Sequence, residues 1–289
     1  MIERIYIPTV NRVNNQITYN GLPASLKEKV VFVVQEWERP QYTYPAQYLV
    51  LPPHITLSNY LAIAETRKEI YYAGRNQKYA VLDDDIIFVR RNSKYWDEDD
   101  KSNMEKSRRP ATYSEIIDMF ELYDTWLDEE GISMCGCGFV ENPPSGESFN
   151  IGTSQSSVYW INGPDFSHIL DELPLVEVKT GEDTLFILSL LSRGYGNKVS
   201  QEYLFDNRSV HNKKIPSVIW DNQSIADTQR DHERIAELFP RYFEVLYESD
   251  GSRVPGGFRN AGKTSTHWRR AYRDGKSEFL SNSLFSLTN

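Results

Sequence analysis

The sequence Lys78-Tyr-Ala-Val-Leu-Asp-Asp-Asp-Ile-Ile-Phe-Val89 is the part of the chain from which the fold prediction starts. Two short apolar runs, residues 79–82 and 86–89, are rich in strand-forming side chains and enclose three consecutive carboxylates. A continuous apolar run of this length is typical of a strand buried in a parallel sheet. We therefore predict a central strand that ends at the carboxylates.

The three carboxylates are Asp83, Asp84 and Asp85. Adjacent carboxylates repel one another unless a cation or hydrogen-bond donors compensate their charge. Mg²⁺ and Mn²⁺ take oxygen ligands and bridge phosphates, and open α/β sheets bind their ligands at the carboxyl ends of strands. The triplet predicts a metal–diphosphate site, and the alternative is a solvated acidic turn.

Composition places the chain among globular proteins, because 39% of its 289 residues are hydrophobic and 25% are charged. Its two cysteines, Cys135 and Cys137, are too close in sequence to bridge comfortably and too few for a four-cysteine zinc site. The sequence starts without a basic-then-apolar leader, and no apolar run approaches the length that spans a membrane. These features predict a cytoplasmic protein with no membrane partner.

Charge is distributed unevenly along the chain. Residues 251–276 contain seven Lys or Arg and one acid, whereas residues 1–250 carry a net charge of −14. We predict a catalytic domain over residues 1–248 and a loosely ordered basic tail over residues 249–289. The tail is a candidate contact for nucleic-acid phosphates, and the alternatives are a solubilising tail or an arm that packs on another subunit.

Strand and helix patterns alternate along the domain. Apolar runs predict strands at residues 4–7, 29–34, 48–51, 132–140, 158–161 and 199–205. Helical spacing predicts helices at residues 58–74, 114–130, 185–192 and 224–239, with Ser58 and Ser114 as N-caps of the first two. Such alternation implies an α/β fold with a mostly parallel sheet, flanking helices and a small antiparallel addition.

Two further motifs stand at fixed distances from the triplet. Arg67 lies sixteen residues before Asp83, and Gly181-Glu-Asp-Thr-Leu-Phe186 opens an apolar helix about a hundred residues after it. With the triplet, these motifs over residues 3–215 resemble the GT-A glycosyltransferases, whose Rossmann-like fold uses a nucleotide-sugar donor and a divalent metal. Lys68 stands where that family usually has Asn.

The resemblance implies roles for several side chains. Asp83 would meet the donor ribose or a water on the metal, Asp85 would bind Mn²⁺ or Mg²⁺, and the role of Asp84 stays open. Arg67 would contact the nucleotide or brace the acids. His211 would complete the metal shell, with a solvent-exposed His as the alternative. The implied donor is a UDP-sugar.

Glu182 and Asp183 are the candidate catalytic residues. A carboxylate is stabilised in its charged form at a helix N-terminus, and over an acceptor hydroxyl it can serve as general base. Asp183 would be that base in an inverting reaction, whereas both acids would orient the acceptor in a retaining one. The alternative is a helix cap.

The N-terminal sequence narrows the resemblance. The motif Ile7-Pro-Thr-x-x-Arg-x-x-x-Gln-x-Thr18 and the basic tail are most similar to bacteriophage glycosyltransferases that are associated with TET-like DNA hydroxylases. This likeness implies that Thr9, Arg12 and Gln16 contact the nucleotide, that the acceptor is a hydroxymethylated pyrimidine in DNA, and that the enzyme acts in the cytoplasm of a bacterial host.

Two other classes of function compete with glycosyl transfer. A nucleotidyltransferase on a related sheet also uses acids and a metal, but it usually has a Gly-rich phosphate loop, which residues 8–20 lack. A non-enzymatic nucleic-acid-binding protein would use residues 251–276, although the acidic remainder of the chain argues against this as the sole function.

Overall fold

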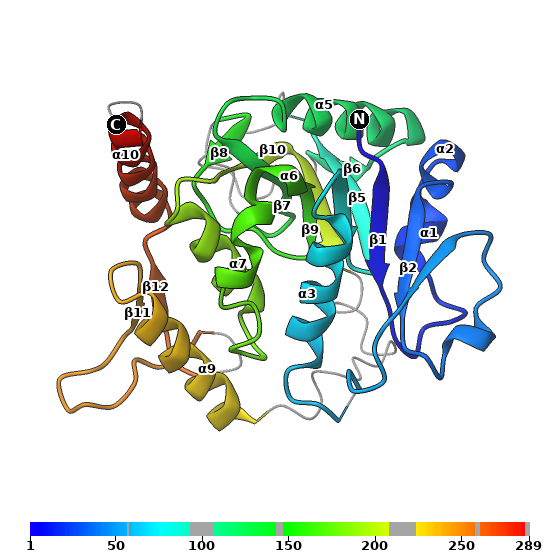
Figure 1. Ribbon diagram of the computed structural model, residues 1–289. Helices are drawn as coiled ribbons and strands as arrows, with labels where there is room; N and C mark the ends of the chain where they lie inside the picture. The colour runs from blue at the N-terminus through cyan, green and yellow to red at the C-terminus, as the bar shows by residue number, and fades with distance from the viewer. Residues whose placement is uncertain (57, 93–106, 143–146, 208–223, 258–260, 287–289) are drawn as a thin grey trace.

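The computed structural model describes residues 1–56, 58–92, 107–142, 147–207, 224–257 and 261–286. It confirms the predicted α/β class: a large central sheet has helices on both faces, and a small antiparallel sheet lies beside it (Figure 1). The described strands of the large sheet follow the order β3-β2-β1-β4-β9-β7-β10-β5-β6, and β8 pairs with β10 outside this path.

The strands of the large sheet run mostly in one direction. β3, β2, β1, β4, β7 and β10 are parallel to one another, while β9, β5 and β8 run the opposite way. Their bounds are β1 Arg4–Pro8, β2 Val30–Val34, β3 Gln47–Val50, β4 Lys78–Leu82, β5 Ile86–Arg91, β6 Arg108–Pro110, β7 Ile132–Phe139, β8 Phe149–Ile151, β9 Val158–Asn162 and β10 Gly196–Asn207.

The continuous apolar strands are buried on both faces. In β1, Ile5 and Ile7 contact one core and Tyr6 contacts the other, because successive side chains point to opposite faces of a sheet. β4 divides its side chains in the same way, and all of residues 79–82 are buried. This double burial explains why the sequence shows no polar alternation in these strands.

Helices cover the two faces of the sheet. The first core contains side chains of α3 (Ala62–Gly74), α6 (Gly163–Phe166), the 3-10 helix η3 (Ser167–Glu172), α7 (Glu182–Leu191) and α9 (Ile225–Leu238). The second core contains side chains of α1 (Ile17–Gly21), α2 (Ala24–Lys27) and α5 (Tyr113–Trp126). A further 3-10 helix, η1 (Arg39–Gln41), follows β2. α3, α7 and α9 therefore lie on the same face (Figure 1).

Two predicted helix starts were wrong. α3 begins at Ala62 and not near Ser58, because Asn59 forms a turn in which its Oδ1 accepts a hydrogen bond from the Leu61 N–H at 2.9 Å. α5 is capped by Thr112 and not by Ser114: Thr112 and Glu115 form a reciprocal capping box. The polar residue that directly precedes a helical pattern is thus not always its cap.

The prediction of a loosely ordered tail was also wrong. Residues beyond 249 form β12 (Thr264–Thr266), which pairs with β11 (Phe243–Val245), and α10 (Trp268–Ser286), which packs against the end of α7. The cause is close packing of small residues in α10, where Ala271 is fully buried and Gly275 touches the backbone of the α7 C-terminus. Phe258 and Arg259, which belong to the predicted basic stretch, lie outside the described residues.

Gly275 offers a test of this packing. A Cβ at Gly275 would lie 2.4 Å from the Leu191 carbonyl oxygen and 2.5 Å from the Gly194 nitrogen. Gly→Ala inside a helix normally stabilises it by about 1 kcal/mol, but we expect Gly275→Ala to destabilise the protein by about 1–3 kcal/mol through overpacking. Urea unfolding measures this change. Ser277→Ala, at an exposed position of the same helix, is the control, and a stabilised Gly275→Ala would contradict the packing.

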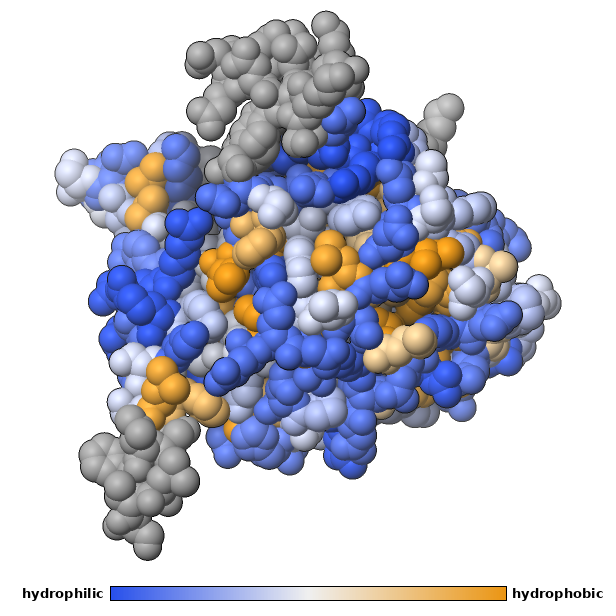
Figure 2. All heavy atoms as spheres, turned by 90° about the horizontal axis from the view of Figure 1, so that it is seen from above, coloured by the Kyte–Doolittle hydropathy of each residue, from blue (hydrophilic) through white to orange (hydrophobic). Residues whose placement is uncertain are grey.

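The surface gives no sign of a large apolar face on the side shown in Figure 2, which looks down on the end of the molecule where β1 begins. Hydrophilic side chains predominate there, and the hydrophobic ones form small, separate patches. Among the described residues, no helix has the length and apolar character needed to cross a membrane.

Candidate functional site

A cavity of about 980 Å³ lies where β1, β4 and β7 end and α7 begins. It contains the two predicted groups of acids, because parallel strands bring their carboxyl ends to one edge of the sheet. Every described residue predicted for the site except Gln16 lines this cavity: Thr9, Arg12, Arg67, Asp83, Asp84, Asp85, Glu182 and Asp183. His211 lies outside the described residues.

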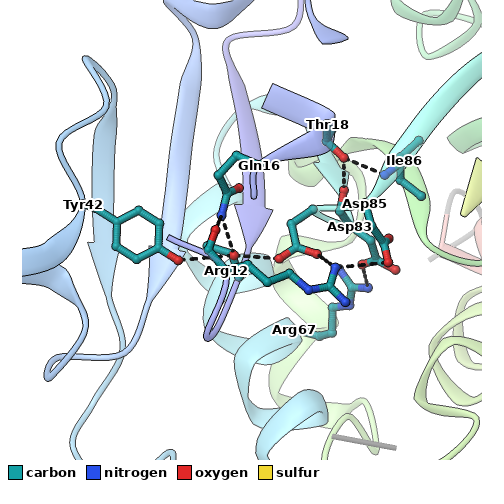
Figure 3. A network of polar contacts seen from close by, with 10 residues as sticks. Arg12, Gln16, Thr18, Tyr42, Arg67, Asp83, Asp85 and Ile86 are labelled. Carbon is teal, nitrogen blue, oxygen red and sulfur yellow. Dashed lines mark hydrogen bonds and ion pairs between the residues drawn. The ribbon is translucent and has the colours of Figure 1, made fainter. Parts of the chain in front are cut away.

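Asp84 holds the loop after β1 against the end of β4. Its Oδ2 accepts a hydrogen bond from Thr9 Oγ1 at 2.6 Å, and its Oδ1 forms a 2.5 Å ion pair with Arg12. Gln16 is buried behind them and donates from Nε2 to Thr9 Oγ1 and to the Arg12 carbonyl. Both oxygens of Asp84 are therefore used inside the protein, and Gln16 supports the loop (Figure 3).

A single hydroxyl fixes the turn of the triplet. Thr18, in α1, donates from Oγ1 to the Asp83 carbonyl at 2.5 Å and accepts from the Ile86 N–H at 2.8 Å. Its own N–H donates to the Asp84 carbonyl. These bonds hold the backbone of residues 83–86 from one side. The side chains of Asp83 and Asp85 lie beside the arginine side chains, Asp83 near Arg67 and Asp85 near Arg12 (Figure 3).

Two arginines face the remaining acids of the triplet. Arg12 lies 3.1 Å from Asp85 Oδ2, and Arg67 lies 2.5 Å from Asp83 Oδ1. The Asp83 side chain is the most exposed of the three, with 27% of its surface accessible against 10% for Asp84 and 5% for Asp85. Asp83 is therefore the acid of the triplet that a bound ligand reaches most easily.

Arg67 connects the triplet with the second pair of acids. Its side chain is buried in α3, its charge acts on both Asp83 and Asp183, and its guanidinium lies 5.9 Å from the centre of the Tyr159 ring. Its Nε and Nη1 have no hydrogen-bond partner among the described residues. A buried guanidinium with spare donors is suited to an anionic ligand.

Glu182 and Asp183 form the first turn of α7. Gly181 precedes them with φ of +83°, the left-handed conformation that glycine adopts readily. Both side chains are open to the cavity and otherwise enclosed by protein, and this burial raises the pKa of both. Arg67, the Tyr159 hydroxyl and the Ser157 N–H oppose the rise for Asp183. The two acids interact, so the pair keeps a proton to higher pH than an isolated carboxyl group would.

Residues from α9 to α10 form one wall of the cavity, which the sequence did not reveal. His232 of α9, Phe243 of β11, Thr264 and Thr266 of β12, and Trp268 of α10 line the same cavity. His232 is buried, burial lowers its pKa, and its Nδ1 has no hydrogen-bond partner among the described residues. It carried no signal in the sequence because the residues around it come from distant segments.

The described lining of the cavity has an excess of negative charge. It contains five carboxylates and two arginines, and a nucleoside diphosphate would add further negative charge. No three His, Cys, Asp or Glu side chains among the described residues could hold a metal ion by themselves. Mg²⁺ commonly binds through one or two carboxylates plus substrate phosphates, and Asp83 with Asp85 fits that donor set.

The buried acids predict how stability depends on pH. Burial outweighs the attraction of Arg12 and raises the pKa of Asp84 to about 7, far above its unfolded value of about 3.9. The folded state then holds a proton that the unfolded state has lost, so the contribution of Asp84 to stability is fully present below about pH 4 and is lost as pH rises through about 7. The raised pKa values of Glu182 and Asp183 act in the same direction.

We therefore expect the thermal midpoint to fall between pH 5 and pH 8 on account of these groups. Scanning calorimetry at both pH values measures the fall, and Asp84→Asn should make it shallower. Mn²⁺ should raise the midpoint more at pH 8 than at pH 5, because a cation favours ionised carboxylates. A midpoint that rises with pH in the wild type and is unchanged in slope by Asp84→Asn would contradict this account.

Comparison with known proteins gives little further information. No protein-family model and no curated protein matches the sequence. Among solved structures, UTP-bound UGPase from Acinetobacter baumannii is similar with a TM-score of 0.35 and 10% sequence identity, over 76% of this chain and 97% of the other. A likeness at this level carries no conclusion about activity.

Proposed function

We propose that the protein is a metal-dependent glycosyltransferase that moves a sugar from a nucleoside diphosphate sugar to a hydroxyl group. The observation that supports this proposal is the placement of Glu182 and Asp183 in the same cavity as the Asp83–Asp85 triplet, with Arg67 close enough to act on both groups. One acidic group suits a metal and a diphosphate, and the other suits proton removal from a neutral acceptor.

The triplet end of the cavity would bind the donor. Thr9 and Arg12 line it beside Asp83 and Asp85, the two residues that would hold Mn²⁺ or Mg²⁺ together with the donor phosphates. When bound, the ion would stabilise the charge that develops on the leaving diphosphate. The positive charge of Arg67, which lines the same cavity, would stabilise the developing charge from the protein side.

Asp183 is the proposed general base. It would take the proton of the acceptor hydroxyl as that oxygen forms a bond to the anomeric carbon, and the anomeric carbon–oxygen bond would break with its electron pair leaving on the diphosphate. Asp183 lines the cavity, and its buried Oδ1 has no hydrogen-bond partner among the described residues, so one acceptor position of this carboxylate is unused. If the reaction retains configuration, Asp183 and Glu182 orient the acceptor instead.

The same geometry weighs against nucleotidyl transfer. When nucleotidyl transfer makes a nucleotide sugar, the nucleophile is the phosphate of a sugar phosphate, which the acidic pair at the N-terminus of α7 would repel. Arg12 and Arg67 are the arginines of the described lining, which contains no lysine, and both are paired with the triplet. A neutral hydroxyl nucleophile suits this environment better.

The finer proposal is that the donor is a UDP-sugar and the acceptor a hydroxymethylated pyrimidine in DNA. Trp268 lines the cavity at the start of α10, and the exposed side of that helix carries basic residues that could hold phosphates: Arg269, Arg270, Arg273 and Lys276. Asp274 offsets part of this charge, since Arg241, Arg270 and Arg273 lie within ion-pair distance of it. A phage-encoded enzyme would act in the cytoplasm of its host.

The decisive experiment is to incubate the protein with a panel of nucleotide sugars and Mn²⁺, with and without hydroxymethylated DNA, and to identify the products. Glycosyl transfer releases a nucleoside diphosphate and adds a sugar mass to the acceptor, whereas nucleotidyl transfer in its synthetic direction consumes a nucleoside triphosphate and releases pyrophosphate. DNA binding without any turnover would favour a binding protein. Chelation of the metal should abolish the reaction if the proposal holds.

A further inference from the structure

Asp231 lies in α9 with only 2% of its surface exposed, and all its hydrogen bonds are made within the protein. Its Oδ2 accepts from the N–H groups of Thr180 at 2.9 Å and Lys179 at 3.2 Å, and its Oδ1 accepts from the Tyr60 hydroxyl at 2.8 Å. A buried carboxylate with three donors is well compensated, and removing it leaves those donors unsatisfied. It therefore belongs to the structure around the site.

The segments that Asp231 joins lead to the two functional helices. Thr180 is followed directly by Gly181 and the Glu182–Asp183 pair of α7. Tyr60 stands just before α3, the helix that carries Arg67. The Asp231 carboxylate thus connects two segments. One is the turn before α7, which carries Asp183, and the other is the segment before α3, which carries Arg67.

The turn before α7 has no capping side chain of its own. Gly181 occupies the N-cap position, and no side-chain hydrogen bond caps this helix. α9 supplies the support from outside: Asp231 binds the two preceding N–H groups, and Ile235 Cδ1 lies 3.0 Å from where a Cβ on Gly181 would be. The position of Asp183 therefore depends on α9.

We propose that Asp231 is a positioning residue for the proposed transfer, holding the Glu182–Asp183 turn and the start of α3 at a fixed separation so that Asp183 stays beside Arg67. This inference rests on the proposed function for its kinetic consequences. Asp231 itself does not line the cavity, whereas its neighbour His232 does. Displacement of a catalytic group by about 1 Å can lower a rate by about 100-fold, so a small loss of order in this turn has a large kinetic effect.

The test is Asp231→Asn, which keeps the size of the side chain but replaces one acceptor oxygen with a donor. We expect kcat to fall by about 10- to 100-fold, with the KM for the donor and the Kd for the nucleoside diphosphate unchanged. Tyr60→Phe removes the hydroxyl that donates to Asp231 and, at 3.5 Å, to the Asp227 carbonyl, but it leaves the bonds from Asp231 to the turn before α7, so it should lower kcat less. Glu237→Gln, an exposed acid that pairs with Arg234 on the same helix, is the matched control and should behave as the wild type.

Amide hydrogen exchange separates this inference from the proposed function. The N–H groups of residues 179–184 should exchange faster in Asp231→Asn than in the wild type, whether or not the protein has transferase activity. If the wild type is inactive but the exchange of residues 179–184 is faster in Asp231→Asn, the proposed function is refuted and the positioning role of Asp231 is supported. Wild-type kcat together with unchanged exchange in a folded Asp231→Asn would overturn the inference. If Asp231→Asn fails to fold, Tyr60→Phe decides by the same two measurements.

Discussion

Replacing Asp183 with asparagine should lower turnover by about 10²- to 10⁴-fold and leave the affinity for the nucleoside diphosphate nearly unchanged. Asp183 belongs to the first turn of α7, whereas the proposed diphosphate site is at the triplet, so Asp183 does not hold the diphosphate in the proposed arrangement. The amide has the same shape, but it cannot take a proton from the acceptor. Because Arg67 keeps its partner Asp83, the fold should survive the change.

Single-turnover kinetics and calorimetry with the nucleoside diphosphate and Mn²⁺ measure the two quantities separately. Glu182→Gln is the matched variant: it neutralises the neighbouring acid, and we expect a smaller loss of turnover because Asp183 is the proposed base. Added formate or azide should restore part of the Asp183→Asn rate if the reaction inverts configuration. A variant that turns over normally would reduce Asp183 to a residue of the helix terminus.

The acids of the candidate site could be predicted because each lies next to an apolar pattern that forms a strand or a helix. The apolar runs around Asp83–Asp85 form β4 and β5, and the apolar helix after Gly181 forms α7. Strand direction then brings both groups to one edge of the sheet. Short-range information was therefore sufficient to find these acids, although it could not show that Arg67 acts on both groups.

The supporting residues could not be predicted because their partners are distant in sequence. Asp231 binds N–H groups more than fifty positions away and a tyrosine hydroxyl 171 positions away. The composition of the C-terminal segment, rich in Gly, Ser, Arg and Asn, indicated disorder, yet Ala271 and Gly275 place α10 against α7. Close approach of backbones leaves no periodic signal in the sequence, and local propensity is a weak guide where tertiary packing decides.

Replacing Arg67 with methionine should destabilise the protein by about 3–5 kcal/mol near pH 8, because it leaves buried acids without their cation. Arg67 forms an ion pair with Asp83 and acts to lower the pKa of Asp183. Without it the pKa of Asp183 rises further. The folded variant then binds a proton more tightly than the unfolded chain over a wider pH range, so its stability falls more steeply with increasing pH.

The difference in unfolding free energy between wild type and Arg67→Met should therefore be larger at pH 8 than at pH 6, as measured by urea unfolding at both values. Arg67→Lys keeps the charge but replaces the planar guanidinium with a single ammonium group, so its unfolding free energy should lie between those of the wild type and Arg67→Met. The acid limb of the transfer rate in Arg67→Lys should move less than that in Arg67→Met, for which we expect a shift of about one pH unit or more to higher pH. Equal destabilisation of Arg67→Met at pH 6 and pH 8, with an unmoved acid limb, would contradict this account. Arg67 would then act through packing on Tyr159 and not through the effect of its charge on the two groups of acids.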